Sequence, residues 1–376
     1  MFDQVYSENG SGGKRVLSVS GGGLLGVIPA AMLMRFEALG QAAYGNAYRL
    51  CHSFDVVGGT STGAVIATGV ALRMHAQQIA DFYLRDVPQG FRRRVLRVPG
   101  WHDLMDAELL EHYFSHRSQG RQLRAGDLEC DLCVVIKNAT RGETVALSSL
   151  VPECAPDLPG VALSHAQVPL EKMLRASTAV PGLFAPVKLP IGPKGAAHVC
   201  IDGGLSPFNT PALLLAKLAR AANAMPGSVD LLALGTGNST QPRQSDKQLT
   251  SAPAGLRLLR ALKAMIRDGE IVSDAMLQTI ASDPQAWLRY CKLDMPLDDQ
   301  TLAEAGIRQT GKARRALRDF ADPRGKTALF EGAMRYASGL VDCALPLTDA
   351  GAHALDRLAG SGTNTETKPR EYAING

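Results

Sequence analysis

Long uninterrupted apolar runs are missing from this sequence of 376 residues. A helix that crosses a bilayer needs about 18 or more consecutive apolar residues, so we expect no membrane-spanning segment. Residues 1–14 are polar and rich in glycine, and they lack the apolar centre of a signal peptide. We therefore expect residues 1–14 to form a flexible tail and not a cleaved leader.

A disulfide framework and a strong charge imbalance are lacking as well. The seven cysteines are an odd number scattered through a long chain, which favours reduced thiols and a cytoplasmic protein. Cys130 and Cys133 have the spacing of a metal or redox pair, but no second pair accompanies them and they alternate like strand residues. The net charge of +4 does not indicate a nucleic-acid polymer as partner, and it would not repel an anionic membrane.

One serine stands among glycines between two apolar segments. Residues 54–57 are typical of a short strand and residues 62–73 of a buried helix, so Gly59-x-Ser61-x-Gly63 has the form of a nucleophile elbow. Glycines permit the sharp turn that exposes the hydroxyl, and the start of the helix directs N–H groups toward an oxyanion. The alternative is a glycine-rich turn with an incidental serine.

A second glycine motif, Gly21-x-Gly23-x-x-Gly26, lies between a predicted strand at 15–20 and a predicted helix at 29–43. This spacing also fits a dinucleotide-binding loop, which would need an acidic residue about 20 positions further, at the end of the next strand. That next strand ends in the serine elbow instead. The loop therefore favours the other use, in which bare backbone N–H groups stabilise an oxyanion.

Asp202 follows a predicted strand at 198–201 and precedes Gly203 and Gly204. An aspartate on such a turn can be presented into a cleft as a general base, while an ordinary Asp-Gly turn is the alternative. The pattern further predicts strands at 128–136, 143–147 and 231–234, and helices at 77–84, 170–178 and 211–224.

Two segments combine cations with apolar residues. Residues 91–101 interleave four arginines with bulky apolar residues, which fits either an anionic lipid interface or a solvated basic loop. Residues 241–345 are mostly helical by periodicity, and 256–267 carry four cations that would suit an anionic or nucleotide ligand or a merely solvated helix face.

The two glycine motifs and Asp202-Gly203-Gly204, in this order, resemble the patatin-like phospholipase family. Residues 176–181, 209–211 and 234–237 resemble it too, so the similarity extends over residues 15–240. It implies an α/β protein with a three-layer patatin-like fold, in which helices flank a central, mostly parallel sheet. A mainly helical part at 241–359 would pack on this core, and a disordered tail would follow at 360–376.

The resemblance also assigns roles to residues. It implies that Ser61 is the nucleophile and Asp202 its base, in a dyad without histidine, and that no metal or cofactor is needed. The oxyanion donors would be the N–H groups of Gly21, Gly22 and Gly23, and the other motif positions are Gly26, Gly59, Gly63, Gly203 and Gly204. The family often has an aspartate where this chain has Ser20 and a basic residue where it has Leu25, so any contact made by that cation is missing.

Several functions remain open at this point. The first is a phospholipase A-type lipid acyl hydrolase at the inner membrane surface. The second is the same enzyme activated by a cyclic dinucleotide, as in some bacterial patatin-like anti-phage effectors, with the extra C-terminal part as an activator or homo-oligomer contact. The third is an α/β-hydrolase-type serine esterase, for which His353 is the only histidine after Asp202. The fourth is a catalytically silent nucleotide-binding module.

Overall fold

The computed structural model describes residues 13–87, 108–153, 156–222, 228–237, 254–304 and 330–336. The strands are β1 (Lys14–Val19), β2 (Val56–Thr60), β3 (Asp131–Asn138), β4 (Glu143–Ser148), β5 (Val161–Ser164), β6 (Val187–Leu189), β7 (His198–Asp202), β8 (Val229–Leu234) and β9 (Leu288–Leu293). The α-helices are α1 (Val27–Tyr44), α2 (Thr62–Ala71), α3 (Ala76–Asp81), α5 (Glu108–Ser118), α6 (Leu170–Ser177), α7 (Ala212–Ala221), α9 (Ala254–Ala281) and α10 (Asp299–Glu304). Short helical turns are η1 (Gly23–Gly26), η2 (Leu50–Ser53), η3 (Phe82–Asp86), η4 (Ala125–Asp127), η5 (Pro193–Gly195) and η6 (Gly203–Leu205).

The nine strands in the described part of the chain join one sheet in the order β5-β4-β3-β2-β1-β8-β9, with β7 on β3 and β6 on β7. Strands β3, β2, β1, β8 and β9 run parallel to one another, while β4 and β7 pair antiparallel with β3. The central strands are buried on both faces and rich in Val, Leu and Ile, as parallel strands covered by two helix layers must be. The predicted α/β class with a mostly parallel sheet is confirmed.

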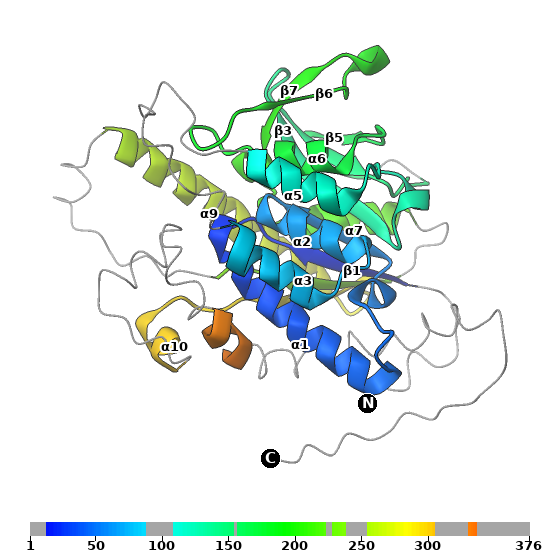
Figure 1. Ribbon diagram of the computed structural model, residues 1–376, viewed down its shortest axis with the longest axis vertical. Coiled ribbons are helices and arrows are strands. Elements are labelled where there is room, and N and C mark those ends of the chain that lie inside the picture. Colours follow the sequence, from blue (N-terminus) through cyan, green and yellow to red (C-terminus); the bar gives the residue numbers. More distant parts are fainter. Residues whose placement is uncertain are drawn as a thin grey trace.

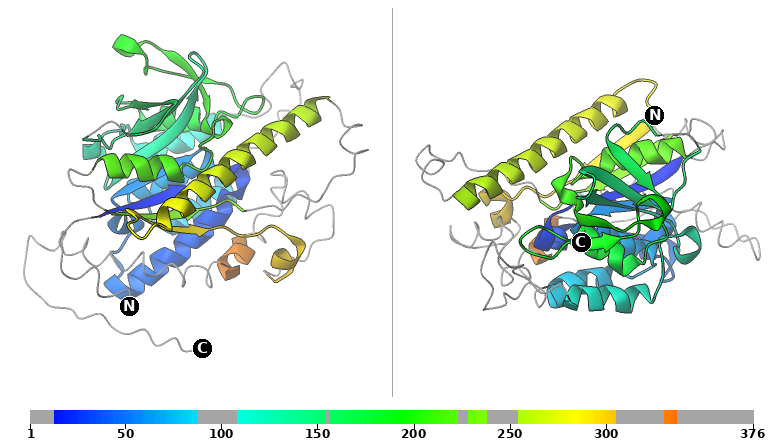
Figure 2. Two further views of the ribbon diagram at one scale, coloured as in Figure 1. Left: turned by 180° about the vertical axis from the view of Figure 1, so that it is seen from behind. Right: turned by 90° about the horizontal axis from the view of Figure 1, so that it is seen from above.

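Alternate side chains along the strands face two different helix layers. In β1, Leu17 and Val19 pack in a core with α1, α2 and α6, whereas Val16 packs in a second core with α7 and with Leu277 of α9. Figure 2 shows α9 on the opposite side of the sheet from α1. The fold therefore has three layers, and the labelled elements can be followed in Figure 1.

Strand β3 sets the relative position of the two motif strands. Its residues 131–135 pair with β2, where Thr60 lies opposite Val135. Its next residues pair with β7, where Asp202 lies opposite Ile136. The end of β2 and the end of β7 therefore meet at neighbouring positions of one strand. This register brings together two motifs that are 141 residues apart in the sequence.

Strand β2 differs from its predicted range because it continues through both glycines to Thr60. A Cβ on Gly58 would lie 2.7 Å from the Cys133 carbonyl oxygen and 2.7 Å from a methyl carbon of Leu215. Glycine in a strand often marks such a close approach of neighbouring groups. The glycines thus belong to the strand, and only Ser61 makes the turn.

The region predicted as mainly helical also contributes a strand. β9 pairs parallel with β8 and extends the sheet beyond residue 240, so the region expected to be mostly helical also holds a strand that was not predicted. The pattern Leu-Arg-Tyr-Cys-Lys-Leu has only its two end residues fully buried, which gives neither an alternating nor a continuous apolar signal. The basic segment 91–101 lies outside the described residues.

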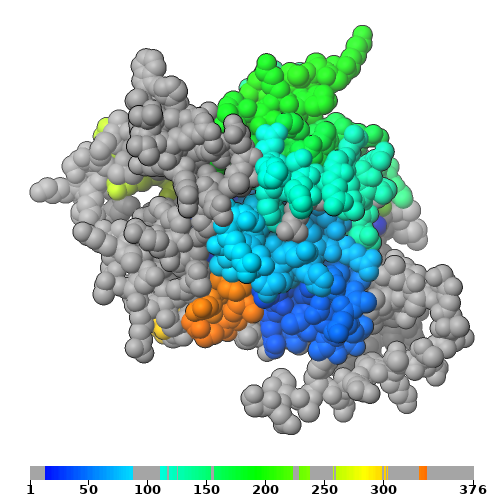
Figure 3. Space-filling model, viewed as in Figure 1, coloured from blue at the N-terminus to red at the C-terminus, as the bar shows by residue number. Residues whose placement is uncertain are grey.

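Residues Gly23–Tyr44 form the one described segment that is long and apolar enough to cross a membrane by length and composition alone. Of its most apolar window, 72% is buried inside the protein, so α1 packs as a core helix. Residues 330–336 add Ala333 to the same core and lie beside α1 in Figure 3, where they are orange and α1 is blue.

Candidate active site

Ser61 occupies the sharp turn between β2 and α2. Its φ of 54° and ψ of −121° lie in a region that side chains other than glycine rarely adopt. Its glycine neighbours allow the close contacts of the turn. A Cβ on Gly59 would lie 2.1 Å from the Gly63 carbonyl carbon, and a Cβ on Gly63 would lie 2.1 Å from the Val19 carbonyl oxygen. The geometry is that of a nucleophile elbow.

The Ser61 hydroxyl points at Asp202. Ser61 Oγ donates a hydrogen bond of 2.7 Å to Asp202 Oδ2, and the N–H of Gly204 donates one of 2.7 Å to Asp202 Oδ1. Ser61 is 8% exposed and Asp202 3% exposed. No histidine within the described ranges hydrogen-bonds to either side chain, and His353 lies outside those ranges. In such a pair the hydroxyl can act as the nucleophile and the carboxylate as its base.

Burial alters the acidity of the Asp202 carboxyl. Loss of solvent raises its pKa to about 6, although the hydrogen bonds from Ser61 and Gly204 act in the opposite direction. A carboxylate with such a pKa is a stronger base than an exposed one and is still ionised at neutral pH. Asp202 can therefore take the Ser61 proton near pH 7.

Ser177, at the end of α6, holds the backbone of the nucleophile. Its Oγ accepts a hydrogen bond of 2.9 Å from the Ser61 N–H and donates one of 2.8 Å to the Val135 carbonyl. Ser177 is fully buried, and it links the elbow to β3. Sequence reasoning included Ser177 in the family-like run at 176–181 but gave it no role, because the contact depends on a partner 116 residues away.

The glycine loop differs in one respect from the expected oxyanion hole. The N–H of Gly21 donates to the Asn209 carbonyl at 2.9 Å, so it is not free for an oxyanion. The Gly21 carbonyl accepts hydrogen bonds from Thr236 Oγ1 at 2.8 Å and from Asn209 Nδ2 at 3.3 Å. These bonds fix the trans peptide that joins Gly21 to Gly22. Because the C=O and N–H of a trans peptide point in opposite directions, the Gly22 N–H points away from Thr236 and Asn209. Gly21 is thus a positioning residue, and Gly22 and Gly23 remain as donor candidates.

The loop packs directly against the elbow. A Cβ on Gly21 would lie 3.3 Å from the Thr60 carbonyl oxygen, and a Cβ on Gly26 would lie 2.4 Å from Thr62 Oγ1. The two residues that flank Ser61 therefore both meet the glycine loop. The Leu25 side chain is buried in the apolar core, so this position presents an apolar group to the protein interior and no cation to a ligand.

The turn after Asp202 also depends on glycine. A Cβ on Gly203 would lie 2.3 Å from the Val135 carbonyl oxygen, and one on Gly204 would lie 2.8 Å from Asn209 Oδ1. Both distances are too short for a real side chain. The motif glycines thus let the loop that carries Asp202 approach β3 and the Asn209 side chain.

Helix α9 reaches this site from the C-terminal part of the chain. Glu270 Oε1 accepts hydrogen bonds from Asn209 Nδ2 at 2.7 Å and from Thr210 Oγ1 at 3.4 Å. Asn209 bonds to both the N–H and the carbonyl of Gly21. Sequence reasoning did not connect Glu270 with the site, because periodicity shows that α9 is a helix but not what its inner face contacts.

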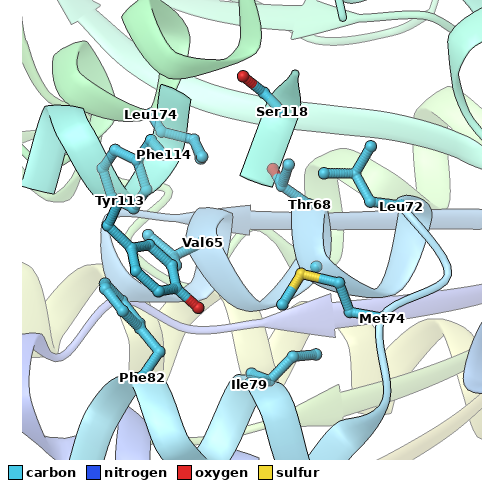
Figure 4. Close-up of a pocket in the computed structure, with 11 residues that line it drawn as sticks. Val65, Thr68, Leu72, Met74, Ile79, Phe82, Tyr113, Phe114, Ser118 and Leu174 are labelled. Carbon is cyan, nitrogen blue, oxygen red and sulfur yellow. The ribbon is translucent and has the colours of Figure 1, made fainter. Parts of the chain in front are cut away.

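An apolar hollow lies along α2 on the side of α3, α5 and α6 (Figure 4). Its lining includes Val65, Gly69, Phe82, Tyr113 and Leu174. Its volume is about 20 Å³, room for about one water molecule, whereas a cavity that binds benzene is on the order of 150 Å³. The hollow is therefore too small, in this conformation, to hold an acyl chain.

The Cys130 and Cys133 pair shows no metal-binding geometry. Burial raises the pKa of the Cys133 thiol to about 12, which keeps this strand residue protonated and unreactive. Among the residues that the structure describes, no group of three His, Cys, Asp or Glu side chains is arranged to hold a metal ion.

Comparison with known proteins identifies the family of the chain. A family model described as patatin-like phospholipase matches residues 17–216, which is more than half of the chain. The chain belongs to the patatin-like phospholipase family. The matched range contains both glycine motifs, Asp202 and Ser177.

Relatives in the patatin-like family come from bacteria and plants. The chain is 25% identical over 202 residues to the cGAMP-activated phospholipase of Vibrio cholerae, covering 50% of this chain and 51% of the relative. It is 39% identical over 84 residues to Patatin-17 of Solanum cardiophyllum, covering 20% and 22% of the two chains. Among solved structures, VipD from Legionella pneumophila is similar with a TM-score of 0.39 and 13% identity, over 88% of this chain and 67% of that one. The matches span about a fifth to a half of the length of these curated relatives.

Proposed function

We propose that the protein is a lipid acyl hydrolase that cleaves fatty acyl esters of phospholipids through a Ser61–Asp202 dyad. The observation that carries this proposal is the 2.7 Å hydrogen bond from Ser61 Oγ to Asp202 Oδ2 on a strained nucleophile elbow. Membership of the patatin-like phospholipase family supports a lipid as substrate. The enzyme would act from the cytoplasm, peripherally at the inner membrane surface.

The first half of the reaction acylates Ser61. Ser61 Oγ attacks the ester carbonyl carbon while its proton moves to Asp202 Oδ2. The carbonyl oxygen becomes an oxyanion, which the N–H groups of Gly22 and Gly23 stabilise. The intermediate then collapses, the bond to the glycerol oxygen breaks, and Asp202 returns the proton to that leaving oxygen. The products are a lysophospholipid and an acyl-enzyme.

The second half regenerates the enzyme. Asp202 takes a proton from a water molecule, whose oxygen attacks the acyl carbonyl carbon. The resulting oxyanion uses the same two donors, and its collapse breaks the bond to Ser61 Oγ. The proton on Asp202 passes to that oxygen, and the fatty acid leaves. One base thus serves both steps.

The test is release of fatty acid from mixed phospholipid vesicles by the wild type, Ser61→Ala and Asp202→Asn. We expect Ser61→Ala to be inactive and Asp202→Asn to lose at least about a hundredfold in rate. Ser148→Ala is the control, because Ser148 is also fully buried but its hydroxyl bonds to Leu150 and Cys133 and to neither member of the dyad. Equal release by all versions would exclude the dyad. If no version releases fatty acid and no probe labels Ser61, a catalytically silent nucleotide-binding module becomes the better account.

Activation by a cyclic dinucleotide is a further part of the proposal. It is supported by the Vibrio cholerae relative, whose name states activation by cGAMP, and by the low exposure of Ser61. An activator would open the site to a lipid, and the natural setting would be antiviral defence. We expect vesicle hydrolysis to rise at least about tenfold when cyclic dinucleotides are added, whereas indifference to a panel of them would exclude this regulation but leave the hydrolase.

A further inference from the structure

Exposed large apolar side chains are concentrated on α9. The described residues expose six of them, and five belong to this helix, with exposed fractions between 37% and 69%. We call four of them the outer face of α9, because at about 100° per residue they lie within roughly 80° of one another around the helix: Leu262, Met265, Val272 and Met276. Ile271 lies about 100° further round the helix. The sixth is Val151, which lies elsewhere in the fold. A contiguous apolar face on a surface helix usually marks an interaction surface.

This face is not needed for packing against the sheet. The buried side of α9 is formed by other residues, including Ser273 and Leu277, and Leu277 packs with α7 in the second core. The helix has 28 residues and is about 42 Å long at about 1.5 Å per residue. Figure 2 shows that its N-terminal half projects beyond the sheet.

Charge distinguishes the N-terminal half of α9 from the rest of the helix. Residues 254–267 contain four cations and no acid: Arg257, Arg260, Lys263 and Arg267. A helix that combines an apolar face with cations is typical of segments that lie on anionic lipid surfaces. Each cation near such a surface contributes attraction to anionic headgroups.

The inner side of the same helix contacts the active site. Glu270 bonds to Asn209, which positions the glycine loop, and a Cβ on Gly269 would lie 3.3 Å from the Pro207 carbonyl oxygen. A bilayer bound to the outer face of α9 would therefore be separated from the loops that surround Ser61 by about the diameter of one helix, roughly 10 Å. This arrangement suits an enzyme whose substrate remains in a membrane.

We propose that the outer face of α9 docks the protein on an anionic lipid bilayer. The inference rests on the proposed function, which is the reason for choosing a lipid surface as the partner. It adds the element that brings the active site to its substrate. A second copy of the chain fits less well, because four partly exposed side chains offer well under the roughly 800 Å² per partner that a stable dimer buries. The Glu270 contact gives docking a direct route to the oxyanion loop.

The test measures vesicle binding in the Ser61→Ala background, so that hydrolysis cannot alter the membrane. Met265→Asp combined with Val272→Asp places two charges on the outer face, and Val151→Asp is the matched control at an equally exposed position. Vesicles contain phosphatidylcholine with phosphatidylglycerol, or phosphatidylcholine alone. We expect the double variant to bind the anionic vesicles about tenfold more weakly or worse, and the control to bind like its parent.

Three results would overturn the docking proposal. They are unchanged vesicle binding by the double variant, no binding by the parent, and conversion of a dimeric parent to a monomer by the double variant in light scattering. A second assay, with Ser61 restored, separates docking from chemistry. The double variant should cleave a soluble short-chain ester at the wild-type rate but vesicle phospholipid more slowly. If vesicle binding behaves as expected but no version cleaves any ester, docking stands and the proposed hydrolase does not.

Discussion

At the scale of single residues, burial of the Asp202 carboxyl connects chemistry with stability. Its pKa is raised to about 6 in the folded protein, so the folded state binds the proton more tightly than the unfolded chain does. This contribution to stability is fully present below the unfolded pKa of about 3.9 and is lost as the pH rises through about 6. Above that pH the buried charge destabilises the fold by roughly 3 kcal/mol.

Asp202→Asn should therefore lose activity at least about a hundredfold but be more stable than the wild type at pH 8, by up to about 3 kcal/mol, with little difference near pH 4. Denaturant unfolding at the two pH values measures this. Asp294→Asn is the matched control, because burial also raises the pKa of Asp294 to about 6 and this residue bonds to Gly237, not to Ser61. It should gain stability at pH 8 and keep its reaction with a serine probe. A loss of stability at pH 8 in Asp202→Asn would refute the electrostatic argument.

Ser177 should matter more for the rate than its distance from the substrate suggests. Ser177→Ala leaves the Ser61 N–H and the Val135 carbonyl unpaired, so we expect a loss of about 1–3 kcal/mol in stability. We also expect a fall in kcat on the order of tenfold to a hundredfold, because the nucleophile is less well positioned. Ser148→Ala should lose similar stability with unchanged kcat. Equal kcat values for the two variants would mean that Ser177 is only structural.

At the scale of elements, the elbow tolerates no side chain at position 63. Gly63→Ala would bring a methyl group within 2.1 Å of the Val19 carbonyl oxygen. Neither group can move without moving the backbone, because the oxygen belongs to the backbone and the methyl group is attached directly to it. We expect a loss of at least about 1–3 kcal/mol together with loss of serine-probe labelling. Gly126→Ala is the control, because a Cβ there meets nothing within 4 Å. Labelling of Gly63→Ala at the wild-type rate would contradict the observed elbow.

The same scale shows which elements could be predicted from the sequence. The helix at 170–178 and the strand pair at 128–136 and 143–147 agree with α6, β3 and β4 within a few residues, because their apolar patterns are long and regular. β5 and β6 are only four and three residues long and carry too little pattern to be recognised. The π-helical turn η3 interrupts a helix that periodicity predicted as continuous at 77–84.

The site was predictable as a set of motifs but not as a network. Ser61 and Asp202 follow from the glycine patterns around them, and the structure places their side chains in contact. The Gly21 N–H donates to the Asn209 carbonyl, and Asn209 Nδ2 donates to the Gly21 carbonyl. Both bonds join residues that are 188 positions apart. Such long-range bonds depend on the sheet order, which no local pattern contains.

At the scale of the whole molecule, the sheet does not end where the family-like region ends. β9 completes the edge beside β8, and Leu277 of α9 fills the second core. A chain that ends at residue 240 would expose the apolar β8 as an edge strand. We expect it to aggregate on expression, as judged by gel filtration. A soluble truncated chain with cooperative thermal unfolding would show that the C-terminal part is dispensable for the fold.

The central claim is that Ser61 and Asp202 work as a nucleophile and its base. The most direct measurement is the rate at which a fluorophosphonate labels Ser61 across the pH range, followed by mass spectrometry of the intact protein and its peptides. We predict a single adduct on Ser61, a rate that rises as the pH passes about 6, labelling at least about a hundredfold slower in Asp202→Asn, and none in Ser61→Ala. Equal labelling of the wild type and Asp202→Asn, or no adduct on a folded wild type, would contradict the account.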